Sequence, residues 1–117
     1  MQPVVTQGTD RNVKSISVLA AVGTTGLLPA STSGVVYRIV GVQVSMDAAG
    51  TFAIYHGGAY SATKVIAEGF AATNGGSDTP LGDWAPQIAS ANEAVKADIT
   101  GGNARIVLHY IEIRVLG

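Results

Sequence analysis

The chain has 117 residues and a mass of 11.9 kDa, the size of one domain with one modest core. Charged residues make up only 13% of it, about half the usual share, and the formal net charge is −1. Without a basic excess, no nucleic-acid ligand is expected. The hydrophobic content of 47% excludes a disordered chain, and no apolar run approaches the roughly 20 residues that span a bilayer.

The chain contains no cysteine, which excludes a disulfide scaffold, a thiolate metal site and a cysteine nucleophile. Residues 1–6 show no basic segment followed by an apolar one, so no secretory signal is expected and the protein is predicted to be made, and to stay soluble, in a cytoplasm. The low charge also predicts that part of the surface meets another protein, because interface cores are depleted in charge. A neutral surface without a partner is the alternative.

The chain begins with a segment that lacks patterning, residues 1–13, and this predicts an extended N-terminal arm. Residues 14–21 alternate, with Ile16 and Val18 on one face, and predict a strand. Residues 22–29 are punctuated by glycine and proline and predict a loop.

The clearest strand covers residues 35–46, where β-branched residues recur at period two. One face of it is predicted to carry Val40, Val42, Val44 and Met46. A tight turn at Asp47–Gly50 and renewed alternation over residues 51–56 then predict a hairpin.

Further strands are predicted over residues 64–70, 94–100 and 105–115, separated by glycine-rich turns and by a polar loop over residues 73–84. Residues 87–97 could instead form a helix capped by Asn92, but the alternation of Val95, Ala97 and Ile99 favours a strand. Short strands at regular spacing predict an all-β sandwich or barrel.

The last strand is apolar on both faces, with Ile111, Ile113 and Val115 on one and Ile106, Leu108 and Tyr110 on the other. A strand of a two-layer sandwich normally exposes one polar face to water. A second subunit is the simplest third layer, and loops or the arm of the same chain are the alternative. The candidate subunit interface consists of Tyr37, Ile39, Ile106, Leu108 and Tyr110.

No motif predicts catalysis, a metal site or a cofactor. The histidines His56 and His109 stand apart without a metal-ligand spacing, and His109 is expected to be a hydrogen-bonded residue of a sheet or subunit contact. Asp78 and Asp83 could hold calcium, but a solvated loop is the simpler interpretation. Trp84 is predicted either to cap the core or to anchor a contact.

Three segments carry a resemblance to a known family: Tyr37–Gly57, Trp84–Thr100 and Gly102–Val115. In their order of strands and turns they resemble the small jelly-roll capsid decoration (cement) and head-fibre proteins of tailed bacteriophages. The resemblance implies a single antiparallel β-sandwich of jelly-roll type over residues 14–117, a homotrimer, and the major capsid protein of the phage as partner. The arm would contact the capsid through Gln2, Pro3, Val4, Val5 and Arg11.

The function that this resemblance implies is that of a non-enzymatic virion protein, assembled in the host cytoplasm, that binds the outside of the capsid and stabilises it. A trimer that binds only the assembled shell would stabilise it by mass action. The alternative is a receptor- or glycan-binding fibre tip, which a cluster of Tyr55, Tyr60 and Trp84 would favour. A cupin-like metal enzyme is the third hypothesis, and it would need more inward histidines than the chain has.

Overall fold

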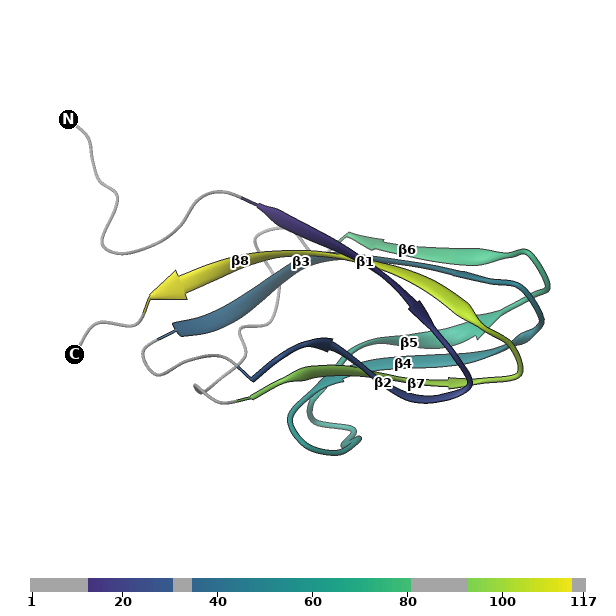
Figure 1. Cartoon of the computed structure of the whole chain (residues 1–117), viewed down its shortest axis with the longest axis horizontal. Helices are drawn as coiled ribbons and strands as arrows, with labels where there is room; N and C mark the ends of the chain where they lie inside the picture. The colour runs from purple at the N-terminus through teal and green to yellow at the C-terminus, as the bar shows by residue number, and fades with distance from the viewer. Residues whose placement is uncertain (1–12, 31–34, 81–92, 115–117) are drawn as a thin grey trace.

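The computed structural model describes residues 13–30, 35–80 and 93–114, and within them the chain forms strands and no helix (Figure 1). The strands are β1 (Lys14–Ala20), β2 (Gly23–Leu28), β3 (Val35–Met46), β4 (Gly50–His56), β5 (Val65–Ala71), β6 (Gly76–Pro80), β7 (Val95–Thr100) and β8 (Ala104–Arg114). The predicted arm lies outside the described residues, except for Val13.

The strands build two four-stranded sheets that pack face to face as a sandwich (Figure 1). The first sheet has the order β1-β8-β3-β6 and the second has the order β2-β7-β4-β5. Every strand pair is antiparallel. This interleaved order is that of a jelly roll, so the predicted fold class is confirmed.

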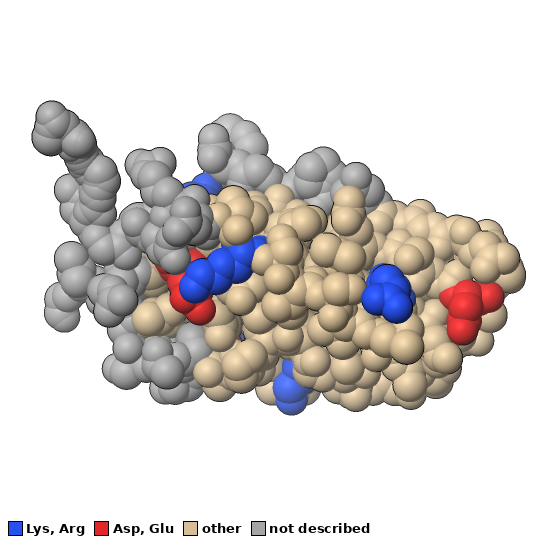
Figure 2. All heavy atoms as spheres, turned by 45° about the horizontal axis from the view of Figure 1, so that its top comes forward, with Lys and Arg blue, Asp and Glu red and all other residues tan. Residues whose placement is uncertain are grey.

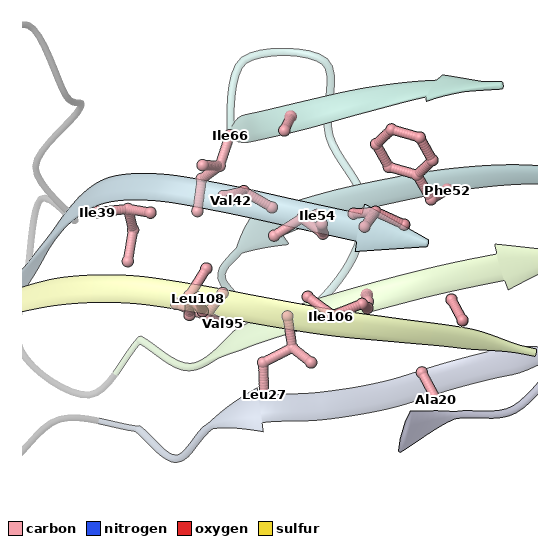
Figure 3. Close-up of a cluster of buried hydrophobic side chains, with 14 of the residues drawn as sticks. Ala20, Leu27, Ile39, Val42, Phe52, Ile54, Ile66, Val95, Ile106 and Leu108 are labelled. Carbon is pink, nitrogen blue, oxygen red and sulfur yellow. The ribbon is translucent and has the colours of Figure 1, made fainter. Parts of the chain in front are cut away.

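The core fills the space between the two sheets (Figure 3). It is built by alternation, since every second side chain of a strand points inward. Ile39 and Leu108 come from the first sheet, Ile54 and Val95 from the second, and none of the four is exposed to solvent. Burying a side chain of this size contributes about 1.5–3 kcal/mol, and these side chains hold the sheets together.

Two strands lie where the sequence predicts loops. β2 has the sequence GTTGLL and β6 has the sequence GSDTP, both poor in the β-branched aliphatic residues that mark a strand. Each is an edge strand, β2 of the second sheet and β6 of the first. An edge strand is paired on one side only and tolerates glycine and proline. The remaining strands lie where they are predicted, to within one or two residues.

The residues predicted as a subunit interface require a correction. Each is at most 9% exposed and belongs to the core of its own chain: Tyr37, Ile39, Ile106, Leu108 and Tyr110. The rings of Tyr37 and Tyr110 pack edge to face, with their centroids 5.6 Å apart. The period-two pattern of a sequence assigns residues to the two faces of a strand, but it does not show which face packs against the core when both are apolar. The solvent side of β8 is the other face, which carries Val107, Ile111 and Ile113.

A β-bulge in β3 corrects a second prediction. The pairing of β3 with β8 shifts register between Ile39 and Gly41, which leaves Val40 as an extra residue. Ile39 and Val42 therefore both point into the core, whereas Val40 is only half-buried. The predicted face of Val40, Val42, Val44 and Met46 is correct for its last three members.

Candidate functional site

The metal-ligating side chains of the described residues do not gather into a metal-binding group. Nowhere in residues 13–30, 35–80 and 93–114 do three or more side chains of His, Cys, Asp or Glu come together. No helix in this part of the chain is long and apolar enough to cross a membrane. Asp78 lies in β6, paired with Gln43, whereas Asp83 and Trp84 lie outside the described residues.

One histidine, His109, forms a pair with a serine on the outer face of the first sheet. The Oγ atom of Ser15 and the Nδ1 atom of His109 lie 2.7 Å apart, joining β1 to β8. The histidine ring packs over Gly41, where an added Cβ would lie 3.4 Å from the ring. The pair is a hydrogen-bonded contact between neighbouring strands of one sheet, as expected for His109 from the sequence.

The other histidine, His56, belongs to an ionic cluster at the end of β4. Its Nδ1 atom donates to Glu93 over 2.9 Å, and the Nζ atom of Lys64 donates to the same carboxylate over 2.7 Å. The bond from Lys64 lowers the pKa of Glu93, and His56 lowers it further, against the opposing effect of burial. The backbone N–H of Gly57 also donates to Ala94. The cluster fastens the β4–β5 loop to the start of β7.

The outer face of the second sheet carries a hydrogen-bonded group around Asp98. Its Oδ1 atom accepts bonds of 2.8 Å from the hydroxyl of Tyr55 and from that of Thr24. Burial raises the pKa of Tyr55, and the bond to Asp98 raises it further. The ring of Tyr60 packs edge to face on Tyr55, and its hydroxyl donates to Glu68. The hydroxyls of Tyr55 and Thr24 thus tie β4 and β2 to Asp98 of β7.

The outer face of the first sheet is weakly charged. Figure 2 shows this side, where Lys, Arg, Asp and Glu side chains are scattered over a mostly uncharged surface. Val107, Ile111 and Ile113 are half-buried along β8, and Arg105 is exposed beside them. Shallow depressions surround Arg105, one of them ≈ 320 Å³ in volume and also lined by Leu19 and Asp47.

Several large apolar side chains are exposed near the sheet edges. They are Val13 at 55%, Leu19 at 66%, Val22 at 60%, Tyr60 at 46% and Phe70 at 69%. Leu19 lies on the outer face of the first sheet and Phe70 on the outer face of the second. A polypeptide contact suits such surfaces better than a small-molecule site, because the depressions are open and shallow.

Of the contact residues predicted from the sequence, those that the structure describes do not lie on these surfaces. The predicted arm residues Gln2, Pro3, Val4, Val5 and Arg11 lie outside the described residues, and the predicted interface lies in the core. Leu19 and Phe70 are exposed apolar residues that were not predicted from the sequence as contact residues. The alternation of Ser15, Ser17 and Leu19 could have assigned Leu19 to the polar side of β1.

Comparisons with known proteins show a similarity in fold to a protein that does not come from a phage. No family model and no curated protein matches the chain. A solved structure from Bacillus endospore appendages, which are described as disulfide-linked pili, matches with a TM-score of 0.54 at 11% identity, over 99% of each chain.

This match corrects the phage resemblance. The expected role as a decoration protein or fibre tip, the virion location and the capsid partner are not supported, because the similar structure comes from pili. The homotrimer was implied by the same resemblance, so it is no longer supported by it. Jelly rolls serve many unrelated functions, so a strand order that suits a capsid protein suits other proteins equally well. Over nearly its whole length, the chain shares its fold with a protein of bacterial spore appendages.

Proposed function

We propose that this chain is a structural subunit that associates with copies of itself into a pilus-like filament on a cell or spore surface. The observation that carries the proposal is the match in fold to a protein of Bacillus endospore appendages over 99% of both chains. A match to a fragment would support only a shared motif. A match that covers nearly all of both chains supports a comparable building block.

The composition of the surface supports self-association. Charged residues make up 13% of the chain, and large apolar side chains such as Leu19 and Phe70 are mostly exposed. Interface cores are depleted in charge and enriched in aromatic residues. A subunit that is surrounded by copies of itself would cover these side chains.

The linkage between subunits must differ from that of the similar structure. The matched appendages are disulfide-linked, whereas this chain contains no cysteine. No disulfide can therefore join its copies, so we propose non-covalent contacts, and the filament should then dissociate on dilution. It should also be indifferent to reducing agents.

Sedimentation velocity over a concentration series tests the proposal. An open filament grows by head-to-tail contacts that do not close, so the size distribution should broaden and shift upward without limit as concentration rises. A thiol reductant should leave the distribution unchanged. A chain that stays monomeric, or that stops at one closed species such as a trimer, would refute the filament.

A further inference from the structure

Two exposed apolar side chains lie on opposite faces of the sandwich. One of them lies beside a basic residue and the other beside an acidic residue. Leu19, 66% exposed, is the direct cross-strand partner of Arg105 on the outer face of the first sheet. Phe70, 69% exposed, lies two residues from Glu68 on the outer face of the second sheet. Residues two apart in a strand share one face and lie roughly 7 Å from each other.

The backbone around Phe70 directs its ring outward. Phe70 pairs with Thr51 of β4, and Gly69 faces inward, where an added Cβ would lie 3.2 Å from the ring of Phe52. The inward position is therefore filled by Phe52, and Phe70 projects from the opposite face. An aromatic side chain displayed in this way is the kind of group that anchors protein interfaces.

The surface around Leu19 is hollowed. Beside it lies the depression of ≈ 320 Å³, whose other lining residues are Ser45, Met46, Asp47, Asn74, Asn103 and Arg105. A second depression continues from it along β3 and β8 and shares Ser45 and Arg105. Arg105 thus stands where the two depressions join.

The charges beside the depression leave Arg105 available to a partner. The Oδ1 atom of Asp47 already accepts the backbone N–H of Asn103 over 2.8 Å, which ties this carboxylate to the adjacent turn. The Nη1 atom of Arg105 donates to Ser17 over 3.2 Å. A guanidinium has five N–H donors, so most of them can serve a second acceptor.

We infer that Phe70 of one copy docks into the depression beside Leu19 of the next copy, with Glu68 pairing with Arg105 across the contact. The inference rests on the proposed function, for which it supplies the contact between subunits. In this contact Phe70 packs on Leu19, and the acidic Glu68 faces the basic Arg105. Each surface is therefore complementary to the other surface, and not to a second copy of itself.

The placement of the two surfaces determines the kind of assembly. They lie on opposite outer faces of the sandwich, so one partner related by a two-fold axis cannot reach both at once. Each copy therefore offers one surface to the copy before it and the other surface to the copy after it. A heterologous contact of this kind produces an open chain unless its rotation closes a ring.

Single substitutions and their mixture test this contact. Phe70→Ser and Leu19→Ser should each raise the concentration needed for assembly by about 10-fold or more, as truncation of an interface anchor does. Val13→Ser is the matched control, because Val13 is 55% exposed just before β1 and far from the depression. It should leave assembly unchanged. Below the concentration at which the wild type assembles, thermal unfolding of all three variants should match that of the wild type, since the side chains are exposed.

The mixture separates this contact from a self-complementary one. The Phe70→Ser variant retains the depression and the Leu19→Ser variant retains the projecting ring. An equimolar mixture should therefore form a 1:1 complex in sedimentation that neither variant forms alone. If wild type assembles but both variants do so equally well, or if their mixture gives no complex, the inferred contact is wrong while the filament stands. If the wild type does not assemble, both the inferred contact and the proposed filament are wrong.

A charge exchange tests the predicted ion pair. Glu68→Arg and Arg105→Glu should each weaken assembly, because each places like charges opposite one another. The double variant restores an opposite-charge pair between neighbouring copies and should assemble at lower concentration than either single variant. A double variant that assembles less readily than both would contradict the pairing.

Discussion

The carboxylate of Glu93 accepts a 2.7 Å hydrogen bond from the Nζ atom of Lys64, and so joins the β4–β5 loop to the start of β7. Its other oxygen accepts the 2.9 Å bond from His56 at the end of β4. Glu93→Gln keeps the shape of the side chain but removes its charge. It should lower the free energy of unfolding at pH 7 by about 1–2 kcal/mol, as expected for hydrogen bonds to a charged group. Chemical denaturation measures this loss, and Glu68→Gln on the exposed face of β5 is the control.

The same carboxylate predicts a pH dependence. The bond from Lys64 holds the pKa of Glu93 below its ordinary value of 4.5. A depressed pKa in the folded state stabilises the protein above the unfolded pKa, and this contribution is lost as pH falls through the folded value. The wild type should therefore lose more stability than Glu93→Gln as the pH falls below about 4.5. Parallel stability profiles for the two proteins would contradict the assignment.

The hydroxyl of Tyr55, on the outer face of the second sheet, is expected to contribute to stability. It is 2% exposed, and its hydroxyl donates to Asp98 over 2.8 Å. Tyr55→Phe should cost about 1 kcal/mol, because Thr24 still donates to the same carboxylate oxygen. Tyr60→Phe removes an exposed hydroxyl from Glu68 and should cost less. Denaturant midpoints of the two variants provide the comparison.

Ionisation of Tyr55 extends this prediction to high pH. Burial, followed by the bond to Asp98, raises the pKa of Tyr55 above 10.0. A raised pKa stabilises the fold below the unfolded value, and this contribution is lost as pH rises through the folded value. Tyr55→Phe should therefore be less sensitive than the wild type to pH above about 10. Equal losses of stability in the two proteins would argue against a role for this hydroxyl.

Neighbouring residues of β8 test which face of the strand lies in the core. Leu108 is 0% exposed, whereas Val107 is half-buried on the outer face. Leu108→Ala should cost about 2–5 kcal/mol, the range for a truncated core side chain. Val107→Ala should cost less than about 1 kcal/mol. A reversed order in urea unfolding would mean that the strand faces the other way.

The start of β4 leaves no room for a side chain at Gly50. An added Cβ there would overlap the backbone carbonyl oxygen of Thr100, which cannot move without disturbing β7. Gly50→Ala should therefore destabilise the fold by about 2 kcal/mol or more. Gly58 is the control, because an added Cβ would meet nothing within 4 Å. Gly58→Ala should change the thermal midpoint little, and equal effects of the two substitutions would contradict the crowding at Gly50.

Much of this fold can be predicted from period-two patterning, and the failures have physical causes. β3 and β8 are rich in β-branched residues, so their positions are evident from the sequence. β2 and β6 are not evident, because an edge strand needs little intrinsic β-propensity once its neighbour is in place. The Val40 bulge reverses the alternation within a continuous apolar run, and no local signal marks it.

The candidate site was harder to predict than the fold. The double-sided pattern of β8 predicts a contact between subunits, but the residues assigned to it include Ile106 and Leu108, which face the core of their own chain. Glu68, two residues before Phe70, is the one local sign that Phe70 faces water, and the pairing of Phe70 with Thr51 fixes that orientation. The resemblance to phage proteins failed for a related reason. It rested on the order of strands and turns, and that order is a property of the fold and not of the function.

Electron microscopy of the purified wild-type chain, combined with gel electrophoresis in detergent without reductant, tests the filament most directly. We expect extended, unbranched filaments that dissociate in detergent into single chains of 11.9 kDa, since the sequence has no cysteine to link them. Fields of isolated protomers or of uniform closed rings, at concentrations up to the solubility limit, would contradict the account.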